Sequence, residues 1–418
     1  MTWETKPLGR IANLIMGQSP ESRYYNDNGE GMPFLQGCAQ FGAIYPMPEV
    51  YCSAPLKIAP KGSILFSVRA PVGDVNVADT DYCIGRGVAA IVPKAVDDQY
   101  LHYYLRFIKP EFERKSQGST FSAINSTELD GLEVYLPVDE HEQSTIAAIL
   151  ATVDHAIEQT KALIAKYQRI KTGLMHDLLT HGIDKHGQLR DPATHKFKPS
   201  PLGMVPEEWE ISSVKSELEI ASGFSLGQHR HPKLHPRKYL RVANVQRGRI
   251  LLDDIAELEA EEHEFQSRIL RQDDLLVVEG HADPNEIGRC AKVPLEGAGL
   301  TFQNHLFRLR CNHLDPRFAL AWLNSEWVRA YWRRNCGTSS GLNTINRTLL
   351  ESVLVPVPGA AEQDTVSKLI DIYESSLRVE EVYLEKFQRL KTGLMQDLLT
   401  GKVSVVGLIG ADPSGLPD

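Results

Sequence analysis

The chain has 418 residues, of which 42% are hydrophobic and 24% are charged, and its formal net charge at pH 7 is -9. This length suits two or three domains, each large enough to bury a core of its own. No run of about eighteen apolar residues occurs and the first residues lack a signal-peptide pattern, so we expect a cytoplasmic protein that neither enters a membrane nor is secreted. The negative charge argues weakly against a nucleic-acid partner, although a local basic patch can hide within the total.

The first predicted domain, residues 1–138, has the pattern of an α+β module. Strands are expected at Gly62–Arg69 and Cys83–Val92, with a tight turn between them, and a helix is expected at Asp98–Phe107. Residues 17–25, which precede these strands, are polar and rich in turn-forming residues.

A long helix is expected at residues 139–180, because apolar residues recur there at alternating steps of four and three. This period is typical of helices that pair as a coiled coil. The expected contact positions are Ile146, Leu150, Val153, Ile157, Ile164, Tyr167, Leu174 and Leu178, with Thr160 and Lys171 as polar exceptions. At about 1.5 Å per residue the helix extends on the order of 50 Å or more, and Gly182 is a natural stop.

A connector, residues 181–206, leads to a second α+β domain, residues 207–358. Strands are expected at Leu275–Val278 and Leu306–Leu309, and a helix at Arg317–Arg333. The domain contains a basic segment, residues 220–252, which has no Asp or Glu but seven Arg or Lys residues. Such side chains reach phosphates and guanine edges, so the segment is a candidate DNA contact. The alternative is that the acidic run at residues 253–264 packs against it as a structural ion-pair surface.

A second long helix is expected at residues 359–400, followed by a tail at 401–418, and it repeats the first. KYQRIKTGLMHDLLT (166–180) and KFQRLKTGLMQDLLT (386–400) agree at twelve of fifteen positions. Its contact positions are Val366, Ile370, Tyr373, Leu377, Leu384, Phe387, Leu394 and Leu398, with Glu380 and Lys391 as polar exceptions. The chain is therefore two copies of one unit, whose C-terminal parts agree and whose N-terminal parts have diverged.

Gly173 and Gly393 lie inside these two helices, where glycine costs about 1 kcal/mol relative to alanine. Two interpretations stay open. Another helix approaches closely at these points, or each helix kinks or ends there.

Candidate DNA contacts come from both domains. Arg69 and Arg86 each stand at a strand end beside glycine or proline turns, where a side chain can reach outward, although each could equally be a salt-bridge partner in the core. Hydroxyls beside glycines at residues 118–120 and 337–339 can donate to phosphate or simply cap a loop. The complete set is Gln18, Ser19, Arg23, Tyr24, Gln36, Arg69, Arg86, Ser119, Thr120, Gln228, His229, Arg230, Lys233, Arg237, Lys238, Arg241, Asn244, Thr338 and Ser339.

Catalytic motifs are missing from the sequence. It contains no GxxxxGK[ST] or GxGxxG phosphate loop, no NPPY-like methyltransferase tetrapeptide and no HExxH. The six cysteines form no CxxC pair and no zinc-like spacing with histidine, so we expect reduced core thiols and no metal site. We expect no catalytic residue and no cofactor bound by this chain.

Several stretches resemble the specificity subunit of type I restriction-modification systems. They are SVRAPVGDVNVA and CIGRGVAAI in the first domain, the connector HGIDKHGQLRDPATHKFKPSPLGMVPEEWE, and LKTGLMQDLLTGKV with its earlier copy. The resemblance implies two tandem target recognition domains of α+β fold, each followed by a long helix. The two helices would pair as an antiparallel coiled coil with pseudo-two-fold symmetry.

The resemblance also implies a function and partners. Each domain would read half of a bipartite, asymmetric site in double-stranded DNA, and the helices would dock two copies of the modification (adenine methyltransferase) subunit. Those subunits would use S-adenosylmethionine, and a separate restriction subunit would use ATP and Mg²⁺. The alternative, motivated by the net charge and the acidic run, is a non-catalytic scaffold whose modules bind protein rather than DNA.

Overall fold

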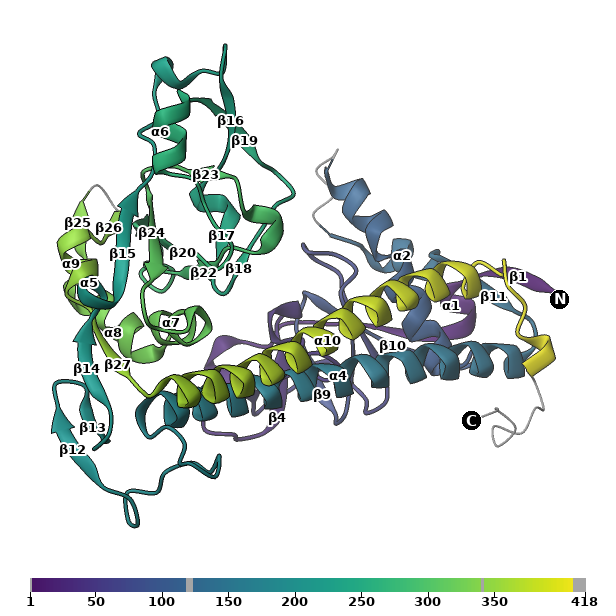
Figure 1. Ribbon diagram of the computed structural model, residues 1–418. Helices are drawn as coiled ribbons and strands as arrows, with labels where there is room; N and C mark the ends of the chain where they lie inside the picture. Colours follow the sequence, from purple (N-terminus) through teal and green to yellow (C-terminus); the bar gives the residue numbers. More distant parts are fainter. Residues whose placement is uncertain (1, 118–122, 340–341, 409–418) are drawn as a thin grey trace. The chain divides into compact units, whose positions relative to one another are not determined.

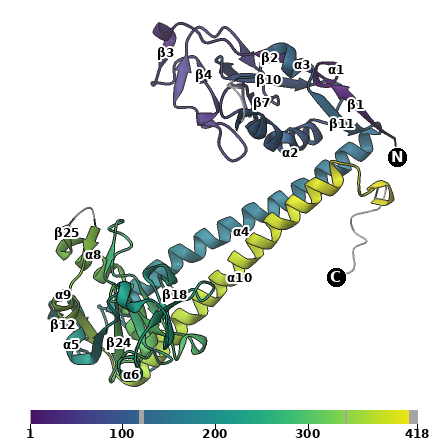
Figure 2. The ribbon, with the colours of Figure 1, turned by 90° about the horizontal axis from the view of Figure 1, so that it is seen from above.

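The computed structural model describes residues 2–117, 123–339 and 342–408, which divide into two compact units (Figures 1 and 2). Unit 1 comprises residues 1–162 and 381–418, and unit 2 comprises residues 163–380. The two expected long helices are present as α4 (Glu140–Thr180) and α10 (Ala360–Leu398). Each unit therefore contains one domain together with part of both long helices.

The long helices pair in antiparallel fashion within each unit, as expected. In unit 1 the Lys391 ammonium lies 2.5 Å from Oδ1 of Asp154, and in unit 2 the Lys171 ammonium lies 2.6 Å from Oε1 of Glu374. None of the expected contact positions in α4 and α10, including the polar exceptions, is fully exposed. The two lysines thus occupy equivalent places and reach equivalent acids across the helix pair.

Neither long helix ends at its glycine, and no close approach of another described segment is found there. Each helix continues past its glycine, α4 to Thr180 and α10 to Leu398. A Cβ atom added at Gly173 or Gly393 would meet nothing within 4 Å, so no other part of the described chain approaches closely there. The chain leaves the helices at Gly182 and Gly401, whose positive φ angles of 63° and 69° suit glycine.

Unit 1 is built on three sheets. The strands are, by sheet order, β1 (Trp3–Pro7) and β11 (Glu133–Pro137); β2 (Ala12–Met16), β10 (Val88–Pro93), β7 (Ile64–Ser67) and β8 (Val75–Val77); and β3 (Tyr25–Asn26), β5 (Val50–Cys52), β4 (Met32–Leu35), β9 (Tyr82–Ile84) and β6 (Ile58–Ala59). Helices α1 (Leu8–Ile11), α2 (Asp98–Gln117) and α3 (Ser126–Asp130) complete the unit. The expected strands at Gly62–Arg69 and Cys83–Val92 and the expected helix are confirmed, although the second strand is interrupted by a turn.

Unit 2 repeats this plan with additions. Its strands are β14 (Glu210–Ser213) and β27 (Leu354–Val357); β15 (Leu218–Ser222), β24 (Leu306–Cys311), β20 (Leu275–Val278) and β22 (Cys290–Lys292); β19 (Ala256–Glu259), β16 (Pro236–Leu240) and β23 (Thr301–Phe302); β17 (Val245–Gln246) and β18 (Arg249–Ile250); β21 (Gly280–His281), β26 (Leu342–Thr344) and β25 (Gly337–Ser339); and, in the connector, β12 (Phe197–Ser200) and β13 (Gly203–Pro206). Its shorter helices are α5 (Val214–Glu217), α6 (Glu262–Ser267), α7 (Pro316–Leu323), α8 (Glu326–Asn335) and α9 (Arg347–Glu351). The single helix expected at Arg317–Arg333 is in fact two, α7 and α8.

An equivalent hydrogen bond in each unit shows which residues of α2 and α7 correspond. The backbone N–H of Asp97, just before α2, donates to the Gln143 side chain at 2.8 Å, and that of Asp315, just before α7, donates to Gln363 at 2.8 Å. Positions along the two helices can be matched from this shared anchor. His102 of α2 then corresponds to Leu320 of α7.

His102 in α2 of unit 1 has an imidazole whose pKa is strongly lowered. Burial lowers the pKa of its imidazole to about 4, and the nearby Arg106 and Lys391 charges act in the same direction. Its Nδ1 atom is buried and has no hydrogen-bond partner within the described residues. The folded protein therefore keeps this ring neutral at pH values where an unfolded histidine, with a pKa of about 6.5, binds a proton.

We expect the stability of unit 1 to fall as the pH drops from about 6.5 to about 4. The unfolded chain binds a proton in this window and the folded chain does not, so the loss reaches about 3 kcal/mol and is absent above pH 6.5. Urea unfolding across this range measures it. His102→Leu, which copies Leu320, should flatten the dependence, whereas His141→Gln at an exposed position should leave it unchanged. Equal slopes in all three proteins would contradict the assignment.

Other expectations concern thiols, metals and membranes. All six cysteines are free thiols. The described residues hold no group of three His, Cys, Asp or Glu side chains arranged to bind a metal ion. Among the helices that the structure describes, none combines the length and the apolar character needed to cross a membrane.

Candidate nucleic-acid interface

In unit 1 the expected residues Arg69 and Arg86 line the same cleft, which has a volume of about 500 Å³. Arg69 follows β7 and Arg86 lies in the turn between β9 and β10. Gly17 brings the chain after β2 close to this turn, since its N–H donates to the Val88 carbonyl and an added Cβ would lie 2.2 Å from the Gly85 oxygen. No side chain larger than hydrogen fits at Gly17 without moving the turn.

Both arginines are exposed, and within the described ranges neither guanidinium makes an ion pair or a hydrogen bond. The polar neighbours are held in place: the Ser19 hydroxyl and the Gln36 side chain lie 3.2 Å apart, and the Arg86 N–H donates to the Ser19 hydroxyl at 3.2 Å. The core salt-bridge alternative is therefore contradicted for both arginines. They are charged groups available to an external anion.

Asn125 and Ser126 also line this cleft, and the sequence interpretation did not select them as site residues. The signal was present, because the segment at 124–127 recurs at 345–348 with different residues at one position. The cleft's acid, Glu128, accepts the N–H of Asn125 at 2.9 Å in a capping box. The Glu128 carboxylate is therefore partly engaged in capping the N-terminus of α3.

The remaining candidates of unit 1 are placed less favourably. Gln18 is exposed, and its backbone N–H bonds to the Ile84 carbonyl. Arg23 lies 3.1 Å from Glu21 and above the Tyr24 ring, 4.9 Å from its centroid, on the exposed surface. Ser119 and Thr120 lie outside the described residues.

Unit 2 presents different side chains at the equivalent place. The bonds Val68 N to Gly87 O and Glu279 N to His305 O, both 3.0 Å, occupy matching positions in the two four-stranded sheets. Adjacent positions then match Arg69 with Gly280 and Arg86 with Asn304. The arginine pair of unit 1 is thus replaced in unit 2, where the neighbouring His305 ring and Glu279 carboxylate share a hydrogen bond at 2.8 Å.

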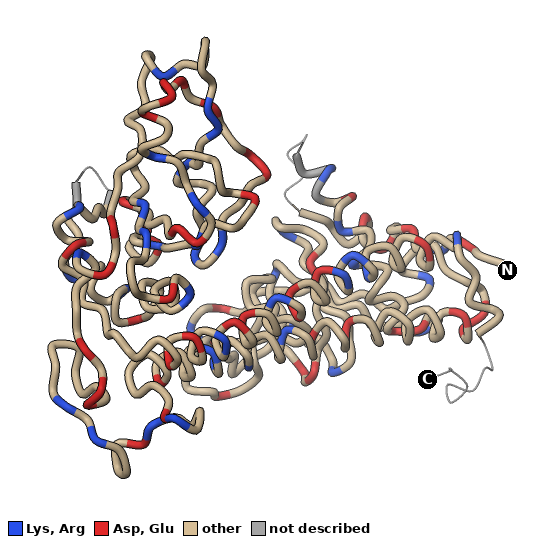
Figure 3. The backbone as a smooth tube through the Cα atoms, in the orientation of Figure 1, with Lys and Arg blue, Asp and Glu red and all other residues tan. Residues whose placement is uncertain are grey.

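The basic segment of unit 2 is partly neutralised by the acidic run that follows it. Three ion pairs join them: Arg230 with Glu264 at 2.7 Å, Arg237 with Glu262 at 2.5 Å, and Arg241 with Asp254 at 2.5 Å. Hydrogen bonding from Arg230 lowers the pKa of the Glu264 carboxyl to about 2. Figure 3 shows the basic and acidic positions of this region close together along the chain trace. The ion-pair alternative is therefore correct for these three arginines, which hold β16 and its neighbours to α6 and the preceding loop.

Asn244 also has a structural role rather than an exposed one. Its side chain is buried, and its amide donates to the carbonyls of Leu251 and Asp254 at 3.1 and 2.9 Å. The expectation that it could read adenine is corrected, because both amide protons are already bonded. The polarity that suggested base reading serves instead to fix a turn.

Four candidates of the basic segment stay on the surface. Gln228, His229, Lys233 and Lys238 are exposed, and in the part of the chain that the structure describes neither lysine makes an ion pair. Thr338 and Ser339 lie in β25, paired with Asn343 and Leu342 of β26.

We expect Lys233→Ala to weaken DNA binding by a similar factor on every sequence and to reduce the salt dependence of binding. A free ammonium contacts phosphate without reading bases, so its loss removes about one counterion from the salt slope. Affinities measured at several salt concentrations, in the assembled complex, test this. Arg230→Ala is the contrasting variant, because it should lower thermal stability by breaking the Glu264 pair. A Lys233 effect confined to one base position would contradict the phosphate role.

Comparisons with known proteins show which proteins this chain resembles. Residues 1–168 match the family model described as "Type I restriction modification DNA specificity domain". The chain is 45% identical over 182 residues to a Methanocaldococcus jannaschii protein assigned as the type I restriction enzyme MjaX specificity subunit, which covers 43% of each chain. The first part of the chain is thus similar to type I restriction-modification specificity subunits. The chain is also 24% identical over 324 residues to the MjaVIII specificity subunit of the same organism, covering 75% of this chain and 72% of that one.

Solved structures agree with this fold. The S subunit of a type I system from M. genitalium matches with a TM-score of 0.59 at 16% identity, covering 95% of this chain and 96% of that chain. A chain from a structure of the type I restriction-modification system matches equally well, with a TM-score of 0.59 and 96% of this chain covered. The α+β domains and paired long helices expected from the sequence are therefore confirmed as the fold of this family.

Proposed function

We propose that this specificity subunit selects a bipartite, asymmetric DNA sequence, with one half read by each recognition domain. The observation that carries the proposal is that the two units have the same helix pairing but present different side chains at equivalent surface positions. The ion pairs Lys391–Asp154 and Lys171–Glu374 repeat between units. At the equivalent surface positions the residues differ, because Arg69 and Arg86 of unit 1 correspond to Gly280 and Asn304 of unit 2.

Such a difference suits the chemistry of base reading. Arginine makes paired hydrogen bonds to guanine, and asparagine suits adenine, so two equivalent surfaces with these residues select different bases. Phosphate contacts would position the complex, and the exposed Lys233 and Lys238 are suited to that. The relatives named above lend no support to the alternative of a protein-binding scaffold.

The same proposal assigns the chemistry to other chains. The paired helices would dock two copies of the modification subunit, which would use S-adenosylmethionine to methylate adenine. A restriction subunit would use ATP and Mg²⁺. The specificity subunit would bind DNA and place the target adenine without taking part in bond making. The repeated helix segment supports one docking position in each unit, because the same helix surface occurs twice.

Methylome sequencing tests the function directly. Cells that express the modification subunit with this chain should carry methylated adenine at one bipartite sequence, and cells that express the modification subunit alone should not. Absence of any methylated motif in the presence of an assembled complex would overturn the proposal.

A further inference from the structure

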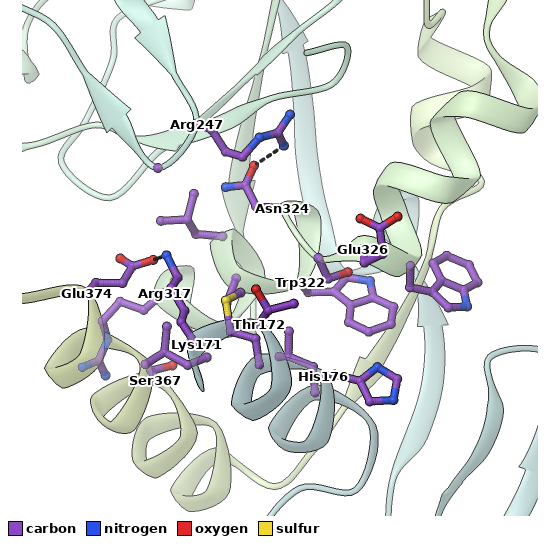
Figure 4. A pocket seen from close by; sticks show the side chains of 18 of the residues that line it. Lys171, Thr172, His176, Arg247, Arg317, Trp322, Asn324, Glu326, Ser367 and Glu374 are labelled. Carbon is purple, nitrogen blue, oxygen red and sulfur yellow. Dashed lines mark hydrogen bonds and ion pairs between the residues drawn. The ribbon is translucent and has the colours of Figure 1, made fainter. Parts of the chain in front are cut away.

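Unit 2 contains a cavity of about 880 Å³ between α7, α8 and the paired ends of α4 and α10 (Figure 4). Its lining combines apolar groups with several charged side chains, among them Lys171 and Glu374 of the helix pair. The residues that matter here are Lys171, Ala321, Trp322, Ser367, Ile370 and Glu374. Glu326 and Asp371 at its edge are exposed, so the cavity is accessible from solvent.

Unit 1 shows what occupies the equivalent space. The anchor that matches His102 with Leu320 also matches Tyr103 with Ala321. Tyr103 is only 6% exposed. Its hydroxyl donates to Oδ2 of Asp154 at 3.0 Å, and the Lys391 ammonium lies 5.7 Å from the centre of its ring. A phenol side chain is therefore enclosed between α2 and the helix pair.

Unit 2 keeps the surroundings of this phenol and lacks the phenol itself. Lys171 corresponds to Lys391, and Glu374 corresponds to Asp154, and these two side chains line the cavity. At the position of the tyrosine stands Ala321, whose methyl group leaves the space open. The cation that would face the ring and the carboxylate that would accept the hydroxyl are both in place.

Ser367 gives an independent indication of a ligand. It is 1% exposed and lines the cavity, and its hydroxyl has no hydrogen-bond partner among the described residues. Burying a hydroxyl without a partner costs about 1–3 kcal/mol. The equivalent residue of unit 1 is Ala147, which needs no partner. A polar atom in the cavity of unit 2 would satisfy this hydroxyl.

We infer that this cavity receives a tyrosine-like aromatic side chain carried by a partner protein, the modification subunit. The inference rests on the proposed function, because it names the anchor by which that subunit docks on unit 2. The ring would lie beside the Lys171 ammonium, in a cation–π contact, and against Trp322 and Ile370. Its hydroxyl would bond to Glu374 or to Ser367. Aromatic side chains that fill a pocket commonly dominate interface energies.

The first experiment fills the cavity from within. Ala321→Tyr, which copies unit 1, should weaken binding of the modification subunit by at least about tenfold while the thermal midpoint stays equal or rises. Ala193→Tyr adds the same side chain at an exposed position of the connector and should leave the affinity unchanged. Titration of the modification subunit onto each full-length variant measures the effect. Undiminished affinity of a folded Ala321→Tyr protein would overturn the inference.

The second experiment does not depend on that variant's stability. p-Cresol, the side chain of tyrosine as a free molecule, should bind the wild-type chain saturably and should not bind Ala321→Tyr. Methylcyclohexane has a similar volume but no ring charge distribution, and it should bind more weakly. Equal binding of the two probes, or no binding of p-cresol, would overturn the aromatic assignment. If p-cresol binds the wild-type chain but Ala321→Tyr leaves the affinity for the modification subunit unchanged, the inference of a protein anchor is wrong. The cavity would then be assigned to a small-molecule ligand.

The two proposals fail in different ways. A wild-type complex that assembles but methylates no bipartite motif contradicts the proposed function. A wild-type complex that methylates its motif, while Ala321→Tyr assembles with the same affinity, contradicts only the aromatic anchor.

Discussion

Arg86→Ala is expected to lower methylation of the bipartite motif by about tenfold to a hundredfold, with the loss concentrated at one base pair of the half-site read by unit 1. A well-placed arginine contact to guanine is worth about 1–3 kcal/mol of discrimination against the wrong base. Arg86 is exposed in a cleft with Arg69, and within the described residues no acidic side chain pairs with it. Methylome profiles of the wild type and the variant, compared position by position, measure the effect.

Two variants separate base reading from general attraction. Arg86→Lys keeps the charge but cannot make the paired hydrogen bonds, so it should resemble Arg86→Ala. Arg23→Ala removes an exposed arginine that already pairs with Glu21 and should change little. An equal loss at every position would reassign Arg86 to phosphate, and an unchanged profile would remove it from the interface.

Glu362→Ala is expected to destabilise unit 2 by about 3–5 kcal/mol. Glu362 lies at the start of α10 and accepts hydrogen bonds from the Arg190 guanidinium at 2.5 Å and from the Trp209 indole at 3.1 Å. It also accepts the backbone N–H of Ile183 at 2.9 Å. The side chains of Arg190 and Glu362 are only 8% and 13% exposed, so removing the carboxylate takes away the closest charged partner of a buried arginine. Denaturant unfolding followed by tryptophan fluorescence measures the loss.

Unit 1 supplies the matched control. Glu142 holds the same position at the start of α4 and is 3% exposed, but its Oε1 atom has no hydrogen-bond partner in the described ranges. Glu142→Ala should therefore cost much less than Glu362→Ala. Glu208→Ala, which removes an exposed acid 4.0 Å from Arg190, should cost less than about 1 kcal/mol. Equal losses from Glu142→Ala and Glu362→Ala would show that the network around Arg190 adds nothing.

The long helices were predictable because their signal is local and repeated. Apolar residues at a fixed period determine which face of a helix is buried, whatever the rest of the fold does. The polar exceptions were different. Lys171 and Lys391 stood at positions that favour apolar residues, and only the antiparallel pairing revealed Glu374 and Asp154 as their partners.

The recognition surfaces were predictable only in part. An excess of Arg and Lys does not say whether each charge is free, and Arg230 is neutralised by Glu264, which is distant in sequence. Arg69 and Arg86 were expected separately, and their meeting in one cleft depends on the pairing of β7 with β10. Asn125 was overlooked because its place beside them is a property of the fold.

The boundaries of the compact units also could not be predicted from the sequence. Residue patterns separate each domain from the helix that follows it. Packing instead divides both long helices, because each end of the helix pair is buried against a different domain. Burial, and not the type of secondary structure, decides which residues share a core.

The order of synthesis follows from that shared core. Leu398, Leu399 and Val405 pack with Leu8 and Ile146 in the core of unit 1. A ribosome makes residues 1–162 first and must then make all of unit 2 before these closing residues emerge. At about 5–20 residues per second, the nascent first domain waits roughly ten to fifty seconds with part of its apolar surface uncovered. During that interval this surface is open to non-native contacts.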